Sequence, residues 1–326
     1  MEASSIGSNL NDPNMSQGNG RTTNPWSLYD TLIDGLPDDG AMGTVESCAI
    51  APIWTYVRTS AGRFGLAMTP LDQYQPIGLR GRVTGMAARD LAREIKSWNV
   101  HQAALGHAAI NSWYNQLERI PADDPRVIVG RPGARRGASG SGSPSGPDLS
   151  VDRPAASEKS AASDKPAGLR VLGGFGALVA GKKVAIIGHA KHMLSMGEIC
   201  QLTVLERVMQ EGDVPDPACE YLLPEQDYVF ITGSSFTNKT APSLIELCHP
   251  CRTILWGPSV PLTEALFGYG VDAMLGQVTT DPAEVARIVC EGGVSTDFMH
   301  VVTPVTWFAD EGFAQEYRDA VETLGM

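Results

Sequence analysis

Five short apolar runs recur between residues 182 and 276, and they constrain the fold more than any other feature of the chain. They read KKVAIIGHA, QLTVLER, DYVFITGSSFTNKT, CRTILWGPSVP and VDAMLG, and helix-like segments separate most of them. Continuous apolar runs of this length are typical of strands that are buried on both faces. Their alternation with helices predicts an α/β fold built on a parallel sheet.

The first half of the chain has a different pattern, which predicts a small α+β module. Apolar residues recur at helical spacing in some segments, and others are rich in β-forming residues. The expected elements are a helix at Trp26–Leu36, a β-hairpin of Val45–Ser60 with Arg63–Pro70, an extended piece at Ile77–Val83, and helices at Thr84–Trp98 and His101–Glu118.

Composition divides the chain into five parts. Residues 1–24 are rich in Gly, Ser and Asn, which predicts a disordered tail. Residues 121–168 are rich in Gly, Ser and Pro, which predicts a flexible linker. We expect an α+β domain at residues 25–120, a parallel-sheet domain at 169–293 and a C-terminal extension at 294–326. The extension contains MHVVTPVTWF, an expected extended piece, and then an expected final helix.

The totals argue against several classes of protein. A formal net charge of -12 disfavours nucleic acid or an anionic membrane as the main partner. No apolar run approaches the roughly 18 residues of a membrane span, and the N-terminus lacks the basic and apolar regions of a secretory signal. The six cysteines have no disulfide-scaffold spacing, so we expect free thiols in a cytoplasmic protein.

The loops after the predicted strands are the expected place for a site, because ligands bind outside the carboxyl ends of the strands in open parallel sheets. The first loop carries Gly188, His189, Lys191 and His192. His189 and Lys191 would suit an anion, His189 and His192 would suit a metal ion, and a plain turn is the alternative. The loop lacks the GxGxxG motif, so a standard pyrophosphate site is not supported.

Glu206 ends the second predicted strand, 18 residues after Gly188. Dinucleotide enzymes place the acid that binds a ribose hydroxyl at about this distance. The carboxylate would also serve as a metal ligand or as a general base, and a strand-end charge in solvent is the alternative reading. Arg207 beside it would neutralise its charge.

The loops after the third and fourth predicted strands are also polar. Hydroxyls, an amide and a glycine before a helix suit either anion binding or an ordinary N-cap. Prolines make the fourth loop rigid, and the GxSxG motif of serine hydrolases is absent. The candidate binding residues of these two loops are Thr232, Gly233, Ser234, Asn238, Gly257, Pro258 and Ser259.

Two further pairs of residues stand outside these loops. Cys248 and Cys251 form a single CxxC, which is a weak zinc signal, and we expect structural thiols there. His107 and Asn111 lie one helical turn apart among small residues, so they share a helix face. They are either structural hydrogen-bonding residues or site residues.

The chain resembles a known domain family, named putative heavy-metal chelation. The motifs that carry the resemblance are GKKVAIIGH, VLER, DVPDPACEYLLPEQDYVFITGSSFTNKT, LWGPSVPL and GVDAMLG, with GLAMT, GLRGRVTGMAARDLA and GHAAIN in a companion N-terminal domain. The resemblance covers about residues 26–118 and 172–292. It implies an N-terminal module like the enolase N-terminal fold, a Rossmann-like doubly wound domain, and a site in the cleft between them.

By motif match, the resemblance implies that Asn111, Glu206, Thr232, Asn238 and Ser259 face that cleft. The chain departs from the family pattern in its long linker, in its C-terminal extension, and at His107, where the family usually has an apolar residue. His107 would add a ligand or an acid–base group.

Two functions are consistent with these residues. The first is a cytoplasmic protein that binds a metal ion of unknown identity, or a metal complex, in the interdomain cleft, with His189 and Glu206 as metal ligands. The second is a Rossmann-type enzyme that holds S-adenosylmethionine or NAD through Gly188, Glu206 and the third loop, with His107, Asn111 and Glu206 as catalytic residues. The polar loops disfavour a non-catalytic scaffold. The sequence does not decide whether the protein forms a homo-oligomer.

Overall fold

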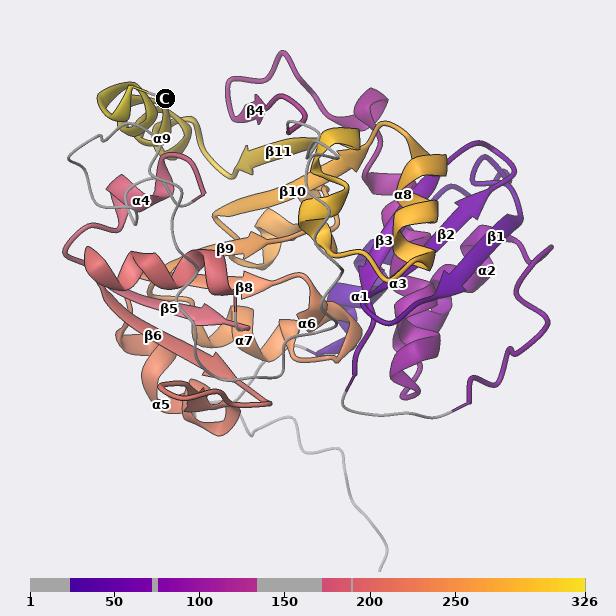
Figure 1. The fold of residues 1–326 in the computed structure, drawn as a ribbon, viewed down its shortest axis with the longest axis horizontal. Coiled ribbons are helices and arrows are strands. Elements are labelled where there is room, and N and C mark those ends of the chain that lie inside the picture. Colours follow the sequence, from indigo (N-terminus) through magenta and orange to yellow (C-terminus); the bar gives the residue numbers. More distant parts are fainter. Residues whose placement is uncertain (1–23, 72–75, 134–171, 189, 326) are drawn as a thin grey trace, which may run out of the picture.

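The computed structural model describes residues 24–71, 76–133, 172–188 and 190–325 (Figure 1). Two sheets are present in these residues, one of order β1-β2-β3 and one of order β4-β11-β10-β9-β8-β5-β6-β7. Three predicted features lie wholly or largely outside the described residues: residues 1–23 of the tail predicted at 1–24, most of the predicted linker, and His189.

The small sheet is antiparallel and is followed by helices, as the sequence predicts. Its strands pair in chain order, and a hairpin joins the second and third. The elements of this module are α1 (Trp26–Asp34), β1 (Val45–Ile50), β2 (Trp54–Thr59), β3 (Phe64–Met68), α2 (Ala88–Ala92), η1 (Arg93–Lys96), α3 (Val100–Tyr114) and η2 (Leu117–Arg119). The extended piece predicted at residues 77–83 does not form. Residues 78–81 form turns instead, and Gly81 has a φ of 71°.

The large sheet contains the five predicted strands, which all run parallel. They are β5 (Lys183–Ile187), β6 (Gln201–Glu206), β8 (Tyr228–Thr232), β9 (Arg252–Trp256) and β10 (Ala273–Thr279). The short β7 (Val214–Pro215) adds a parallel edge, whereas β11 (Val302–Phe308) and β4 (Val127–Val129) add antiparallel strands at the other side. The predicted α/β class, with a parallel sheet and a smaller antiparallel module, is confirmed.

Alternate residues of the parallel strands enter two cores, one on each face of the sheet. Val184 and Ile186 belong to one core, and Ala185 and Ile187 belong to the other. The first core is covered by α4 (Phe175–Leu178) and α9 (Glu311–Leu324), and the second by α6 (Ser234–Thr237) and α7 (Ala241–Leu247). Burial on both faces is why these strands are continuously apolar.

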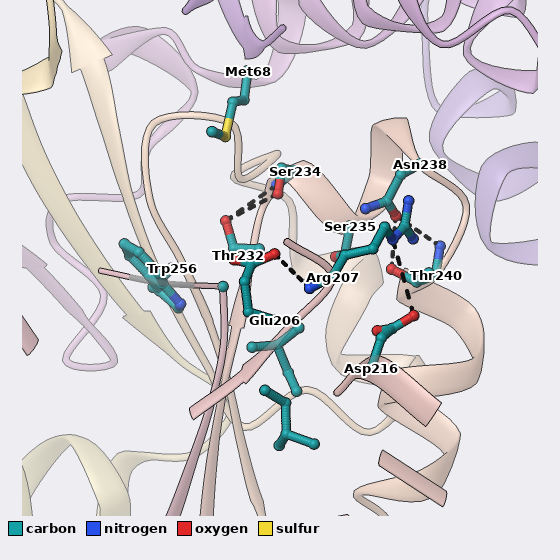
Figure 2. Close-up of a pocket in the computed structure, with 13 residues that line it drawn as sticks. Met68, Glu206, Arg207, Asp216, Thr232, Ser234, Ser235, Asn238, Thr240 and Trp256 are labelled. Atoms are coloured by element: carbon teal, nitrogen blue, oxygen red, sulfur yellow. Dashed lines mark hydrogen bonds and ion pairs between the residues drawn. The ribbon is translucent and has the colours of Figure 1, made fainter. Parts of the chain in front are cut away.

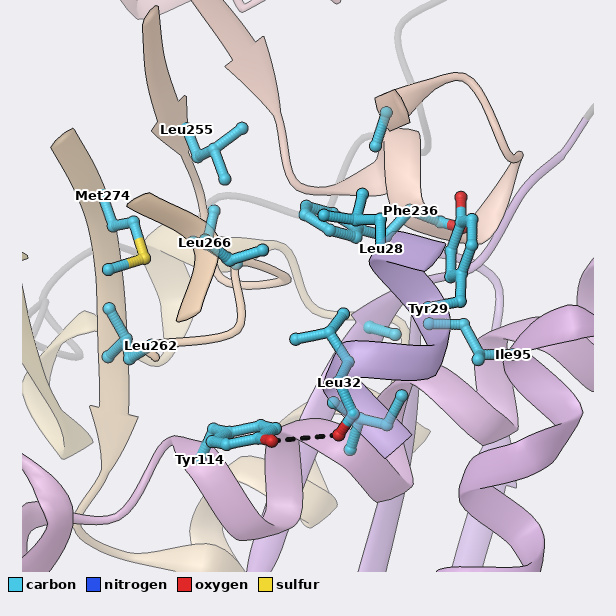
Figure 3. Packing of buried hydrophobic residues seen from close by; sticks show 14 of the residues in the cluster. Leu28, Tyr29, Leu32, Ile95, Tyr114, Phe236, Leu255, Leu262, Leu266 and Met274 are labelled. Carbon is cyan, nitrogen blue, oxygen red and sulfur yellow. Dashed lines mark hydrogen bonds between the residues drawn. The ribbon is translucent and has the colours of Figure 1, made fainter. Parts of the chain in front are cut away.

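The second core continues without a break into the small module. Leu28, Leu32 and Ile95 of the small module share it with Leu255 and Leu266 of the large one (Figure 3). Thirteen of the fifteen residues of α3 are buried, so this helix is covered on all sides. On the outer face of the small sheet, α8 (Pro282–Cys290) packs against β2, which forms a second joint between the modules (Figure 1).

Short segments complete the connections: η4 (Lys191–Glu198), η5 (Asp216–Ala218), α5 (Cys219–Leu222), η6 (Leu223–Glu225), η7 (Glu264–Tyr269), η8 (Ser295–Asp297) and η9 (Met299–Val301).

The structure differs from the predicted division at both ends of the large domain. Strand β4 lies in the predicted linker, and β11 and α9 lie in the predicted extension, yet all three complete the large domain. In the described ranges, no helix has the length and apolar character needed to cross a membrane.

Candidate functional site

The strand order of the large sheet reverses between β5 and β8. From β5 the chain proceeds outward to β6 and β7, and it then returns to β8 on the other side of β5. The loops that leave β5 and β8 therefore diverge, and ligands bind at such switch points in doubly wound sheets. Gly188 follows β5 with a φ of 98°, and a Cβ there would lie 3.2 Å from Cγ2 of Thr232. Any other residue would be strained there by the positive φ and by this close approach, so glycine suits the point at which the first loop passes Thr232.

A pocket of about 200 Å³ opens at this switch point (Figure 2). Its walls come from the carboxyl ends of four parallel strands, from the polar loop after β8, and from one residue of the small sheet. The lining residues are Met68, Ile187, Gly188, Leu205, Glu206, Arg207, Asp216, Thr232, Ser234, Ser235, Asn238, Thr240 and Trp256. Pockets for drug-sized ligands measure roughly 300–1,000 Å³, so this one suits a smaller molecule or part of a larger one.

Local hydrogen bonds orient the uncharged polar groups of the pocket. The Ser234 N–H and hydroxyl both lie within hydrogen-bond distance of Thr232 Oγ1, at 3.4 and 3.3 Å. Asn238 Oδ1 accepts from the Thr240 N–H at 3.1 Å and from the Thr240 hydroxyl at 2.7 Å. The loop is therefore held in one conformation with its hydroxyls and amide at the pocket wall, as Figure 2 shows.

Two carboxylates and one guanidinium supply the charge of the pocket. Glu206 Oε1 accepts from the backbone N–H of Arg207 at 2.7 Å and from that of Val208 at 3.4 Å. Arg207 Nε lies 3.9 Å from Asp216 Oδ2, and both side chains are more than a third exposed. Ion pairs this exposed contribute roughly 0–1 kcal/mol to stability. A ligand that displaces Asp216 from Arg207 would therefore forfeit little free energy.

The structure brings together five of the residues predicted from the sequence. Gly188, Glu206, Thr232, Ser234 and Asn238 line the same pocket. The others do not line it. Those residues are Gly233, Gly257, Pro258, Ser259, His107 and Asn111, while His189 lies outside the described residues.

The loop after β9 supports the pocket from behind. Ser259 is buried, and its Oγ accepts the backbone N–H of Met68 at 2.8 Å. A Cβ on Gly233 would lie 2.7 Å from backbone atoms of Ser259 and Val260, so glycine permits the loops after β8 and β9 to touch. These contacts position Met68, the one pocket residue that the small sheet contributes.

His107 and Asn111 lie in a polar seam between α3 and the large domain, together with Asn115. Asn111 Nδ2 donates to the carbonyls of Leu66 and Ser259, at 2.7 and 3.0 Å. Asn115 Nδ2 donates to Val260 O at 2.9 Å. All three side chains are buried. Spacing of four residues along α3 explains why they share one face.

His107 Nδ1 lies 2.9 Å from Thr237 Oγ1 within this seam. Complete burial, assisted by the positive charge of Lys239, lowers the pKa of His107 to about 3, although the Ser259 backbone opposes the shift. The imidazole is therefore neutral at ordinary pH. A neutral, fully buried ring suits a hydrogen-bonding role in the seam better than proton exchange with a ligand in the pocket.

The main pocket residues that sequence reasoning missed are Met68, Asp216 and Trp256, whereas Thr240 belongs to the loop after the third predicted strand, which was expected to bind a ligand. Trp256 carried a usable signal, since it lies at a strand end beside predicted residues. Asp216 lies in the short segment after β7, which is too short for periodicity to reveal. Met68 lies in the GLAMT motif of the resemblance, but no local pattern indicates that it reaches the pocket, because that depends on how the two modules pack.

The charged groups that the pocket offers as metal ligands are carboxylates, and Met68 adds one thioether sulfur. In the described ranges, no group of three or more His, Cys, Asp or Glu side chains is arranged to hold a metal ion. Glu206 and Asp216 offer carboxylates, whereas soft heavy metals prefer several thiolate, thioether or imidazole ligands, and among the described lining residues Met68 supplies the single thioether. The described side chains therefore do not fit a bare soft ion, but they fit a metal that arrives with most of its ligands already in place.

Comparisons with known proteins agree with this fold. A family model described as putative heavy-metal chelation, DUF364, matches residues 176–307, and a second with the same description, DUF4213, matches residues 29–114. A search of curated proteins found no match. These two models together cover the five predicted parallel strands and most of the small α+β module.

Two solved structures have the same fold along almost their whole length. One is a protein with unknown function from the DUF364 family of Desulfitobacterium hafniense, with 30% identity and a TM-score of 0.66 over 87% of this chain and 98% of that one. The other is a DUF364 family protein of unknown function from Pyrococcus horikoshii, with 17% identity and a TM-score of 0.61 over 87% and 99%, and it supports the fold alone. The chain belongs to the DUF364 family, which is described as putative heavy-metal chelation.

Proposed function

We propose that the pocket at the switch point binds a metal complex, that is, a metal ion already held by a small organic chelator. One observation carries the proposal: polar groups from three strand ends and from the loop after β8 converge on one pocket, and Met68 of the small sheet lines it too. On this proposal the site lies in the cleft between the two modules. The family description supports a heavy metal as the cargo.

The chemistry of the pocket favours a chelated metal over a bare ion. Glu206 is the side chain that would add a ligand to the metal, because a carboxylate binds most metal ions that have an open position. Thr232, Ser234 and Asn238 would bind polar atoms of the chelator, and Arg207 would bind a carboxylate of it. The thioether of Met68 would cover the complex and exclude water.

Calorimetric titration with Ni²⁺ alone and with Ni²⁺–citrate tests this function. We expect the citrate complex to bind the wild-type protein and to bind Glu206→Gln at least about tenfold more weakly, since the amide removes the charged ligand. Glu322→Gln is the matched control, because Glu322 is exposed on α9. Equal affinity of the wild type and Glu206→Gln for the complex would contradict the proposal, as would heat from Ni²⁺ alone that citrate abolishes.

A nucleoside-containing cofactor is the second candidate, and the position of Glu206 favours it. Glu206 ends β6, the strand beside β5, which is where nucleotide-binding sheets place the acid that binds a ribose hydroxyl. The segment after β5 is the short η4 rather than a long helix with a glycine-rich turn, so a pyrophosphate grip is not supported. Titration with S-adenosylmethionine and with NAD decides: absence of heat with both would remove this candidate.

The cytoplasm is the proposed location. All six cysteines are free in the structure, and free thiols are typical of reducing compartments.

A further inference from the structure

A second pocket of about 460 Å³ adjoins the first and shares Asp216 and Thr240 with it. Lys239 lines this second pocket together with Glu220 and Tyr221. Asn238, Lys239 and Thr240 are consecutive, so one short loop forms part of the wall of both pockets. The second pocket has no role in the function proposed above.

Lys239 combines an unfavourable backbone conformation with a partly buried amine. Its φ of 72° is left-handed, a conformation that crowds the Cβ of any residue other than glycine. Its side chain is half-buried, and Nζ donates to the carbonyl of Thr237 at 2.7 Å. No carboxylate among the described residues forms an ion pair with it. Burial lowers the pKa of the amine to about 8.

A purely structural residue at this position would be glycine, which adopts a positive φ without strain and has no amine to bury. A lysine here combines backbone strain with a desolvated charge, and such strain in ordered loops is concentrated at functional sites. A desolvated amine that lines an open pocket, without a carboxylate partner, is the arrangement in which lysine acts as a nucleophile.

We propose that Lys239 is a nucleophilic amine that captures a small carbonyl compound, an aldehyde or an α-keto acid, as a Schiff base in the second pocket. Nζ attacks the carbonyl carbon, and the carbonyl oxygen takes up a proton to give a carbinolamine. The carbinolamine then loses its hydroxyl as water, and a C=N bond replaces the C=O bond. The neutral amine gives up one hydrogen in each of the two steps, and the carbonyl oxygen leaves with two hydrogens as water, so the pocket carboxylates only relay these protons. Glu220 and Asp216 are the proton-transfer groups on the pocket wall.

Reductive trapping with glyoxylate and cyanoborohydride tests the proposal. The chain has only seven lysines, so peptide mass spectrometry can resolve each labelled position. At pH 7.5 we expect Lys239 to be labelled at least about tenfold faster than the exposed Lys182, because a larger fraction of its amine is unprotonated. We expect urea-unfolded protein to lose the difference, and Glu220→Gln to slow labelling of Lys239 without changing that of Lys182.

Two variants separate chemistry from folding. Lys239→Gly should relieve the left-handed strain and raise the urea midpoint of unfolding while it abolishes the fast label. Lys182→Met should retain the fast label at Lys239. Labelling of Lys239 at or below the rate of Lys182 in the folded protein would overturn the proposal, as would a fast label that persists in Lys239→Gly. Neither result depends on whether the first pocket binds a metal complex.

Discussion

At the scale of single residues, His107 shows how burial decides the role of a titratable group. The sequence made it a candidate acid or base because it departs from an apolar family position. In the structure its ring contacts Phe236 and Thr237 and has no exposed surface. Burial, with the charge of Lys239, lowers the pKa of the imidazole to about 3. Protonation of this buried ring should therefore lower the free energy of unfolding.

The pH dependence of stability tests this role of His107. Because the folded pKa lies below the unfolded value of about 6.5, the contribution is fully present above pH 6.5 and is lost as the pH falls toward 3. From pH 7 to pH 5 this group should lower the free energy of unfolding by roughly 2 kcal/mol. Urea unfolding of His107→Gln should lack that loss, whereas His249→Gln, at an exposed residue, should retain it. The same pH-dependent loss in His107→Gln and the wild type would refute the assignment.

At the scale of elements, close backbone approach explains the small-residue run of α3. A Cβ on Gly106 would lie 2.1 Å from the backbone N of Ile95, and a Cβ on Gly65 would lie 2.1 Å from Ala108 O. The helix thus packs against η1 and against β3 at distances that only glycine allows. Such contacts fix the position of β3, which carries Met68 to the pocket.

Gly106→Ala should therefore destabilise the protein by about 1–3 kcal/mol, because the added methyl meets backbone that cannot rotate away. Gly268→Ala is the control, since no atom lies within 4 Å of the position that its added methyl would take, and its φ is not positive. That change should leave stability unchanged or raise it by up to about 1 kcal/mol. Urea unfolding of the two variants provides the comparison, and an equal effect of both substitutions would rule out close packing as the cause.

The parallel strands were predictable because burial on both faces leaves a continuous apolar signature. The helices at α1, α3 and α9 were predicted from the sequence, and in the structure the Asp310 side chain caps α9 by accepting from the Phe313 N–H at 2.8 Å. Strand β4 was not predictable, because three residues carry no periodicity and its pairing with β11 spans the chain. The prediction of an extended piece at residues 77–83 was wrong because the glycines of this segment favour turns.

At the scale of the whole molecule, the seam between α3 and the large domain joins two modules that share one core. Asn115 alone makes two bonds across it: Nδ2 donates to Val260 O, and Oδ1 accepts from the Leu262 N–H, both at 2.9 Å. Since the apolar core also continues across the boundary, we expect the described modules to unfold in one cooperative transition.

Asn115→Ala should leave the buried N–H of Leu262 and carbonyl of Val260 without partners. The free energy of unfolding should fall by about 1–3 kcal/mol for each group left unsatisfied, with the transition still single. Gln315→Ala, which removes an exposed contact with Asp319, should change it by less than about 0.5 kcal/mol. Separate transitions seen by circular dichroism and by fluorescence in the wild-type protein would contradict the single-core description.

The candidate site was partly predictable for the same reason as the sheet. Strand-end positions identified Gly188, Glu206 and Thr232 from the sequence alone, because parallel strands deliver their carboxyl ends to one edge. Met68 and the burial of Asn111 depend on contacts between residues far apart in the chain, and no local pattern encodes those. The enolase-like relationship of the small module stays a prediction.

Native mass spectrometry of the untagged protein as purified, before and after a chelator, is the most direct test of a metal complex in the pocket. We expect an adduct whose mass equals a metal ion plus a small organic ligand in the wild type and in Glu322→Gln, and its loss in Glu206→Gln. Chelator should remove the metal and its organic partner together. An adduct that survives Glu206→Gln unchanged would contradict the proposed function, as would an organic adduct that is indifferent to chelator.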